Sequence, residues 1–174
     1  FMAVSKTLLK ATALKGIPPD SCLESVNKVL VDESLPSMFV TVFYGIFDTR
    51  NGSFEYCNGG HNPPYLISAE GKVRQLDNRG GVFLGALKNL EYESNVVMLQ
   101  PGETLFLITD GITEAMNPGE EMFGEKRTEE SLQSHAGESL NNLVENMIKE
   151  VQAFAGAQEQ SDDMTCLTLR YFGR

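Results

Sequence analysis

The stretch that most constrains this chain is residues 104–115, which read TLFLITDGITEA. Its first part, Leu105–Ile108, is a run of aromatic and branched residues after Pro101-Gly102, a pattern typical of a buried strand. The strand leads directly into Asp110, and Gly111 allows the backbone to turn sharply there. Enzymes commonly place catalytic or metal-binding groups at such strand ends. The pattern therefore indicates Asp110 as a functional residue, although an aspartate here can also cap the next turn.

A second acidic segment lies near the C-terminus, where SDDMT at residues 161–165 precedes the β-rich run Cys166–Phe172. Acids at opposite strand ends can converge on one hard cation such as Mg²⁺ or Mn²⁺, because these ions prefer carboxylate oxygen. Neighbouring side chains on an extended segment point to opposite sides. One member of the Asp162-Asp163 pair is therefore expected to face such a site.

Taken together and in this order, the two acidic segments resemble the C-terminal portion of the metal-dependent protein phosphatases, the PPM or type 2C family. Three further stretches carry the likeness: FMAVSK at 1–6, NGGHNPP at 58–64 and GVFLG at 81–85. The closer likeness is to the bacterial branch of stage II sporulation protein E and the phosphatases that act on anti-anti-sigma factors. The resemblance covers nearly the whole chain.

This resemblance implies a metal-dependent phosphatase that acts on phosphoserine or phosphothreonine in a partner protein, such as an anti-anti-sigma factor in bacterial signalling. It implies two Mn²⁺ or Mg²⁺ ions that activate a water, with no side-chain nucleophile. Matching the closing Asp-Asn or Asp-Asp motif of the family favours Asp162 as a metal ligand together with Asp110. Asp163 would then hydrogen-bond nearby.

One part of the family pattern is absent from the chain. Family members carry, upstream of the first helix, a Gly-Asp segment and then an aspartate shortly before Ser-Gly-Lys-Gly, and this region supplies the carboxylate that bridges the two metals. This chain begins at Phe1 without either segment. We therefore expect residues 1–174 to form a single but partial phosphatase domain that is weakly active or inactive alone. An upstream sensor domain and an upstream membrane anchor are both compatible with this expectation.

Composition narrows the class of protein. The 174 residues are 41% hydrophobic and 22% charged, as in an ordinary globular domain. The net charge of −10 argues against a nucleic-acid partner, because phosphate contacts need clustered Lys and Arg. No apolar run approaches the roughly 20 residues that span a bilayer. With three widely spaced cysteines, the expectation is a cytoplasmic protein with reduced thiols.

The hydrophobic pattern predicts an α+β fold, which the resemblance sharpens to two stacked, mainly antiparallel β-sheets flanked by helices. A helix over Phe1–Lys15 is followed by a second that starts with a capping box of Ser21 and Glu24. Three β-hairpins are expected next, with these strand pairs: 38–47 with 53–57, 65–68 with 72–76, and 96–99 with 104–108. Helices over 125–134 and 139–154 and a last strand complete the pattern.

Three further residues are weaker candidates. His61 could act as acid, base or ligand, but the surrounding Gly and Pro favour a hydrogen bond that shapes its loop. Glu114 could support a metal site or cap a turn, and His135 is expected to be solvated. The alternative to an enzyme is a non-catalytic regulatory or interaction module that signals or forms a homodimer through the two N-terminal helices. A small-molecule phosphoesterase is a third reading.

Overall fold

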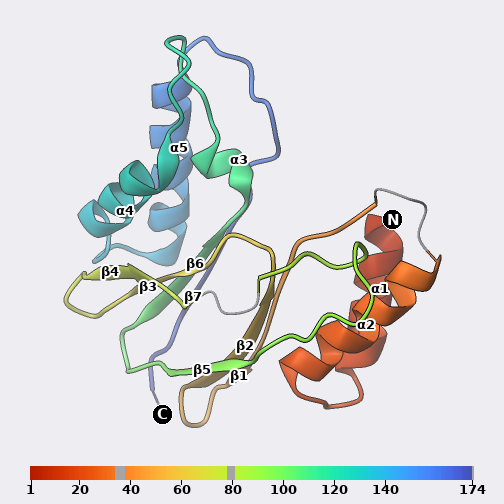
Figure 1. The fold of residues 1–174 in the computed structure, drawn as a ribbon. Helices are drawn as coiled ribbons and strands as arrows, with labels where there is room; N and C mark the ends of the chain where they lie inside the picture. Colours follow the sequence, from red (N-terminus) through yellow and green to blue (C-terminus); the bar gives the residue numbers. More distant parts are fainter. Residues whose placement is uncertain (34–37, 78–80, 174) are drawn as a thin grey trace. The chain divides into compact units, whose positions relative to one another are not determined.

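The computed structural model describes residues 1–33, 38–77 and 81–173, and the chain divides into two compact units (Figure 1). Unit 1 comprises Phe1–Pro63 and Asp77–Met98, and unit 2 comprises Pro64–Leu76 and Leu99–Arg174. The elements of unit 1 are α1 (Met2–Ala13), α2 (Pro19–Glu33), β1 (Val42–Asp48), β2 (Ser53–Gly59) and β5 (Asn95–Met98). Those of unit 2 are β3 (Tyr65–Ile67), β4 (Val73–Gln75), β6 (Thr104–Ile108), α3 (Asp110–Thr113), α4 (Gly124–Ser134), α5 (Leu140–Ala155) and β7 (Cys166–Arg170).

Unit 1 is a three-stranded antiparallel sheet in the order β1-β2-β5, with a pair of helices against it. Helix α2 packs on β1 and β2, and α1 packs on α2 (Figure 1). Leu23, Val26 and Leu30 recur at helical spacing on α2 and are almost fully buried. They form one core cluster with Cys57 of β2 and with Leu84.

Unit 2 is a four-stranded antiparallel sheet in the order β4-β3-β6-β7, with α4 and α5 packed against it. The central strand β6 carries the apolar run that the sequence singles out, and Phe106 and Ile108 are buried. Helix α5 contributes Leu143, Met147 and Val151, which are spaced by four residues and lie in the same core cluster. This core holds the end of β6 in place, and the candidate site follows directly from that end.

The predicted fold class is confirmed, because two antiparallel sheets with packed helices are present. The first two predicted hairpins are also confirmed, as β1-β2 and β3-β4. The predicted helices over 125–134 and 139–154 correspond to α4 and α5. The stacking of the two sheets and a single domain over residues 1–174 stay predictions.

The third predicted hairpin, between residues 96–99 and 104–108, is wrong. Strand β5 pairs with β2 in unit 1, whereas β6 pairs with β3 and β7 in unit 2. The Pro101-Gly102 turn is held instead by the C-terminal segment: Gly102 N–H donates to the Tyr171 carbonyl, and Tyr171 N–H donates to the Glu103 carbonyl. Both edges of β6 are therefore occupied, one by β3 and the other by β7.

Two details of the N-terminal helices also differ from the prediction. Helix α2 begins at Pro19, whose fixed φ suits the first turn of a helix, so Ser21 lies inside it and is not its cap. The Glu24 carboxylate accepts a hydrogen bond from Tyr92 N–H and does not close a capping box. On α1 the buried residues are the polar Ser5 and Thr12, whereas the apolar Val4 is 49% exposed.

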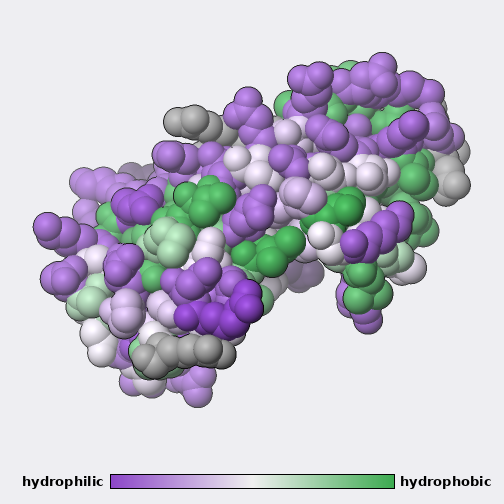
Figure 2. All heavy atoms as spheres, turned by 90° about the horizontal axis from the view of Figure 1, so that it is seen from below, coloured by the Kyte–Doolittle hydropathy of each residue, from purple (hydrophilic) through white to green (hydrophobic). Residues whose placement is uncertain are grey.

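The exterior agrees with the composition. Hydrophilic residues cover most of the surface visible in Figure 2, with smaller apolar areas between them. Among the helices of the described residues, none combines the length and the apolar character needed to cross a bilayer.

Candidate metal site

Asp110 lies where β6 ends and the short helix α3 begins. The preceding residue, Thr109, is the extended N-cap residue of α3, and Asp110 is the first residue of the helix. Asp110 is exposed, whereas Ile108 and Ile112, two positions before and after it, are buried in the core of unit 2. Asp110 therefore lies exposed at the end of a buried strand, and its place at the end of this strand is as the sequence predicts.

The second acidic segment is tied to the first through Thr109. The Thr109 hydroxyl donates to the Asp163 carbonyl at 2.7 Å and accepts from Thr165 N–H at 2.9 Å. The Thr109 N–H also donates to the Thr165 carbonyl at 3.1 Å. These three bonds join positions more than fifty residues apart in the sequence, and they place Asp110 beside the Asp162-Asp163 segment.

Gly111 brings the two segments into van der Waals contact. A Cβ atom on this residue would lie 2.6 Å from the Asp163 carbonyl oxygen and 3.2 Å from the Asp162 carbonyl oxygen. The chain turns here from β6 into α3, but the backbone of Gly111 is helical, so this turn does not require the conformational freedom of glycine. The missing side chain instead makes room for the second acidic segment. The sequence pattern indicates neither Thr109 nor this role of Gly111.

The carboxylates offer the kind of ligand that Mg²⁺ and Mn²⁺ prefer. The Oδ1 atom of Asp110 accepts from Gly111 N–H at 3.1 Å, and Oδ1 of Asp162 accepts from Asp163 N–H at 2.6 Å. An ionised carboxylate has about four lone-pair positions on two oxygens, so one such bond leaves capacity for a cation. The donor set is hard oxygen, and it fits these ions rather than a soft metal.

In the described residues there is no group of three or more His, Cys, Asp or Glu side chains arranged to hold a metal ion. Two carboxylates can still bind such an ion, because Mg²⁺ usually keeps several waters and takes one or two carboxylates together with phosphate oxygens of a substrate. The local charge favours a cation, since Asp110, Asp162, Asp163 and Glu114 are all exposed and acidic.

The structure shows the hydrogen bonds around His61 and Glu114, two of the weaker candidates. In unit 1, the Asn58 side chain donates to the His61 carbonyl and accepts from His61 N–H, both at 2.8 Å, so Asn58 shapes this loop. The His61 ring lies 3.3 Å from the Thr41 hydroxyl through Nδ1. Glu114 follows α3, and its backbone N–H donates to the Asp110 carbonyl.

The expectation that His135 is solvated is wrong. Its side chain is only 24% exposed, because it lies between two glutamates, with Nδ1 at 2.8 Å from Glu138 and Nε2 at 2.8 Å from Glu150. The Asn146 amide also donates to the Glu138 carboxylate at 3.0 Å. The contact with Glu138 is local in the sequence, whereas the contact with Glu150 forms only when α4 and α5 pack together.

Thiol chemistry is not supported near the candidate site. Cys166 begins β7, one residue after Thr165, and burial raises the pKa of its thiol to about 11. Burial likewise raises the pKa of the Cys57 thiol to about 12. Since the thiolate is the reactive form of cysteine, the raised pKa values disfavour thiol reactivity at neutral pH both at Cys166 and, in unit 1, at Cys57.

The sequence of residues 1–172 matches the family described as stage II sporulation protein E (SpoIIE). The chain belongs to this family. The resemblance noted from the acidic segments is thereby confirmed, including the SpoIIE and RsbU branch of the PPM, or type 2C, phosphatases. The SpoIIE family is one of metal-dependent serine/threonine phosphatases.

Two curated relatives align along nearly the whole chain. It is 26% identical over 196 residues to protein IcfG of Synechocystis sp., covering 97% of this chain and 31% of IcfG. It is 27% identical over 172 residues to phosphoserine phosphatase RsbU of Bacillus subtilis, covering 97% of this chain and 50% of RsbU. The chain thus spans half or less of the length of these relatives.

A solved structure supports the SpoIIE-type fold. The SiaA-PP2C domain of Pseudomonas aeruginosa superposes with a TM-score of 0.82 at 20% sequence identity, covering 98% of this chain and 67% of that one. At this identity the likeness concerns the fold, and it agrees with the two antiparallel sheets and packed helices described above.

Proposed function

We propose that this chain acts as a metal-dependent phosphatase domain on phosphoserine or phosphothreonine in a regulatory phosphoprotein, such as an anti-anti-sigma factor. The observation that carries the proposal is the joining of the two acidic segments through Thr109 and Gly111. Membership of the SpoIIE family and the similarity to a protein named phosphoserine phosphatase support it.

In this proposal Asp110 and Asp162 hold a shared Mn²⁺ or Mg²⁺ ion through carboxylate oxygens. Such an ion, when bound, lowers the pKa of a coordinated water and neutralises charge on phosphoryl oxygens. Thr109 and Gly111 are positioning residues, because they fix the spacing of the two segments and do not touch the phosphate. The resemblance implies a second ion and a bridging carboxylate from upstream sequence.

The proposal is tested with the full-length protein and a phosphoserine protein substrate. We expect Mn²⁺-dependent release of phosphate that EDTA abolishes. Asp110→Asn should reduce the rate by at least about 100-fold, because losing a metal ligand should cost at least as much as losing a residue that hydrogen-bonds to a ligand. An unchanged rate in Asp110→Asn removes this residue from the mechanism. Absence of hydrolysis by the wild type, while the phosphoprotein still binds, favours the non-catalytic interaction module.

The substrate class is tested separately. A comparison of a phosphoserine protein with a generic aryl phosphate distinguishes a phosphoprotein phosphatase from a small-molecule phosphoesterase. We expect the higher kcat/KM for the phosphoprotein, because a protein substrate gains binding energy from contacts remote from the phosphate.

A further inference from the structure

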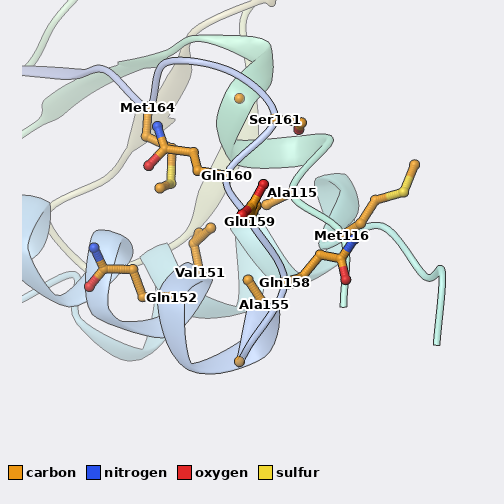
Figure 3. A pocket seen from close by; sticks show the side chains of 12 residues that line it. Ala115, Met116, Val151, Gln152, Ala155, Gln158, Glu159, Gln160, Ser161 and Met164 are labelled. Atoms are coloured by element: carbon orange, nitrogen blue, oxygen red, sulfur yellow. The ribbon is translucent and has the colours of Figure 1, made fainter. Parts of the chain in front are cut away.

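Unit 2 contains a cavity beside the candidate metal site (Figure 3). It lies between the end of α5, the segment after α3 and the loop before β7. Its lining residues are Gly111, Ala115, Met116, Val151, Gln152, Ala155, Gly156, Gln158, Glu159, Gln160, Ser161 and Met164. All of these belong to one unit, so the cavity is a property of that unit alone.

The lining separates into an apolar floor and a polar mouth. Val151 is fully buried, and Ala115, Ala155 and Met164 are half-buried. The polar side chains of the lining are all exposed: Gln152, Gln158, Glu159, Gln160 and Ser161. The apolar side chains of the floor favour an apolar occupant, because a polar group placed against them would lose hydrogen bonds to water.

The size of the cavity limits that occupant to one side chain. Its volume is about 120 Å³, close to the roughly 150 Å³ of an apolar cavity that binds benzene. Met116, which is 39% exposed, stands at the mouth and is bridged to Met122, which is 50% exposed. Methionine side chains are flexible and adapt to different apolar partners, so Met116 suits the wall of a pocket for an apolar group.

The cavity adjoins the two acidic segments along the chain. Gly111 and Ser161 belong to its wall, and each is the chain neighbour of one proposed metal ligand, Asp110 or Asp162. Neighbouring Cα atoms are about 3.8 Å apart. In an extended peptide, side chains two positions apart point the same way and are separated by roughly 7 Å. A side chain two positions from a phosphoserine at the metal site is thus the one whose spacing we compare with this adjacent cavity.

We propose that this cavity is a specificity pocket that receives one apolar side chain, of leucine or methionine size, two positions from the phosphoserine of an extended substrate segment. The inference rests on the proposed function, because it takes the phosphate to be bound at Asp110 and Asp162. The acidic rim at Glu159 adds discrimination, since a carboxylate at that substrate position meets like charge.

The first experiment uses the full-length protein and a panel of alanine-based phosphoserine peptides with a single Leu or Glu at each position from −4 to +4. Phosphate release in Mn²⁺ gives kcat/KM, and non-hydrolysable phosphonate analogues give affinity by fluorescence anisotropy. We expect leucine at −2 or +2 to raise kcat/KM by about tenfold over alanine, the discrimination that a small apolar pocket provides. Glutamate at that position is expected to lower it.

Variants locate the preference in the cavity. Ala155→Leu fills the floor and is expected to reduce the leucine-to-alanine ratio to about twofold or less. Ala157→Leu is the matched control, because Ala157 is exposed and lies outside the lining, and it should keep the ratio. If Ala155→Leu lowers thermal stability, Met116→Gln serves instead, since Met116 is at the mouth and its replacement has nearly the same length.

The outcomes distinguish a failure of the pocket from a failure of the proposed function. A leucine preference that Ala155→Leu or Met116→Gln removes and Ala157→Leu keeps supports the pocket. Hydrolysis with no preference at −2 or +2, or with a preference that neither cavity variant changes, overturns the pocket and leaves the proposed function standing. Leucine-dependent binding of the phosphonates without hydrolysis of the phosphopeptides overturns the proposed function and supports the pocket. Neither hydrolysis nor leucine-dependent binding overturns both.

Discussion

At the scale of single residues, the candidate site depends on a neutral side chain as much as on its acids. The Thr109 hydroxyl both donates to Asp163 and accepts from Thr165 N–H, so one oxygen connects the end of β6 to the segment that leads into β7. Asp110 is attached to this connection by one peptide unit. The approach of the two acidic segments is therefore fixed mainly by backbone and hydroxyl groups.

The first prediction concerns this hydroxyl. Thr109→Val keeps the shape of the side chain but removes both hydrogen bonds, so we expect the free energy of unfolding to fall by about 1–2 kcal/mol. The affinity for Mn²⁺ should fall as well, because the acidic segments are less well held. Urea unfolding and calorimetric titration measure the two effects. Thr109→Ser keeps the hydroxyl and should resemble the wild type, whereas a Val variant equal to the wild type in both measurements would refute this role.

The second prediction concerns the close approach at Gly111. An alanine there places its Cβ 2.6 Å from the Asp163 carbonyl oxygen, so the acidic segment must shift. We expect Gly111→Ala to cost about 1–3 kcal/mol of stability and to weaken Mn²⁺ binding. Gly137→Ala is the matched control, because a Cβ atom added there would meet no atom within 4 Å and the φ of Gly137 is not positive. Similar losses in the two variants would mean that the contact is unimportant.

The sequence points to Asp110 and Asp162 but not to the residues that position them. A carboxylate after a buried strand is visible in the order of residues along the chain, and so is an acidic pair before a strand. Thr109 acts across 54 residues to Asp163, and no local pattern encodes such a contact. The sequence indicates Gly111 only for the freedom of its backbone. Its missing side chain makes room for the Asp162-Asp163 segment, which only the fold brings near.

At the scale of elements, α4 and α5 are joined by the His135 cluster. His135 is the C-cap residue of α4, and it contacts Glu138 before α5 and Glu150 within α5. The two glutamates raise the pKa of the His135 imidazole above its usual value of 6.5 through hydrogen bonds and charge. The same hydrogen bond lowers the pKa of the Glu138 carboxyl below 4.5.

The third prediction follows from the signs of these shifts. The stabilisation by protonated His135 is fully present below the unfolded pKa and is lost as the pH rises through the raised folded pKa. The Glu138 contribution is lost only as the pH falls through its lowered folded pKa. We therefore expect the Tm difference between the wild type and His135→Gln to be larger at pH 6 than at pH 8.5. Scanning calorimetry at both pH values measures it, and an equal difference at the two would contradict the ion-pair account.

Helices and hairpins with a clear local pattern are predictable from the sequence. Which distant strands pair with each other is less predictable. Helix α5 shows strong helical spacing, and β1-β2 has turn residues at 48–52, so both predictions are correct. The predicted hairpin across Pro101-Gly102 is wrong, because a turn signal does not show that its flanking strands pair with each other. The backbone of this turn instead forms hydrogen bonds with Tyr171 of the C-terminal segment. The residues around the turn do not indicate this distant partner.

At the scale of the whole molecule, a net charge of −10 favours cations in general, so specific binding must be distinguished from general attraction. A ligand that binds only the folded state at 100 times its Kd stabilises that state by about 2.7 kcal/mol. For a protein of this size, that corresponds to a rise in Tm of roughly 5–10 °C.

The fourth prediction uses this rise in Tm to distinguish specific binding from general attraction. We expect saturating Mn²⁺ to raise the Tm of the full-length protein by several degrees relative to EDTA, and Asp110→Asn to remove most of that rise. Glu130→Gln is the control for general charge, because it removes one exposed acid of α4, outside the candidate site. An equal loss of the Mn²⁺ effect in the control would indicate non-specific attraction.

The central claim is that Asp110 and Asp162 bind the same ion, and a double-mutant cycle of Mn²⁺ affinity tests it most directly. Calorimetric titration of Asp110→Asn, Asp162→Asn and the double variant gives the coupling energy between the two residues in Mn²⁺ binding. Asp163→Asn is the neighbouring control. We expect each single substitution at Asp110 or Asp162 to weaken binding by at least about 100-fold, the double variant to lose little more, and the control to bind as the wild type does. Unchanged affinity in either single variant, or fully additive losses, would contradict a shared ion.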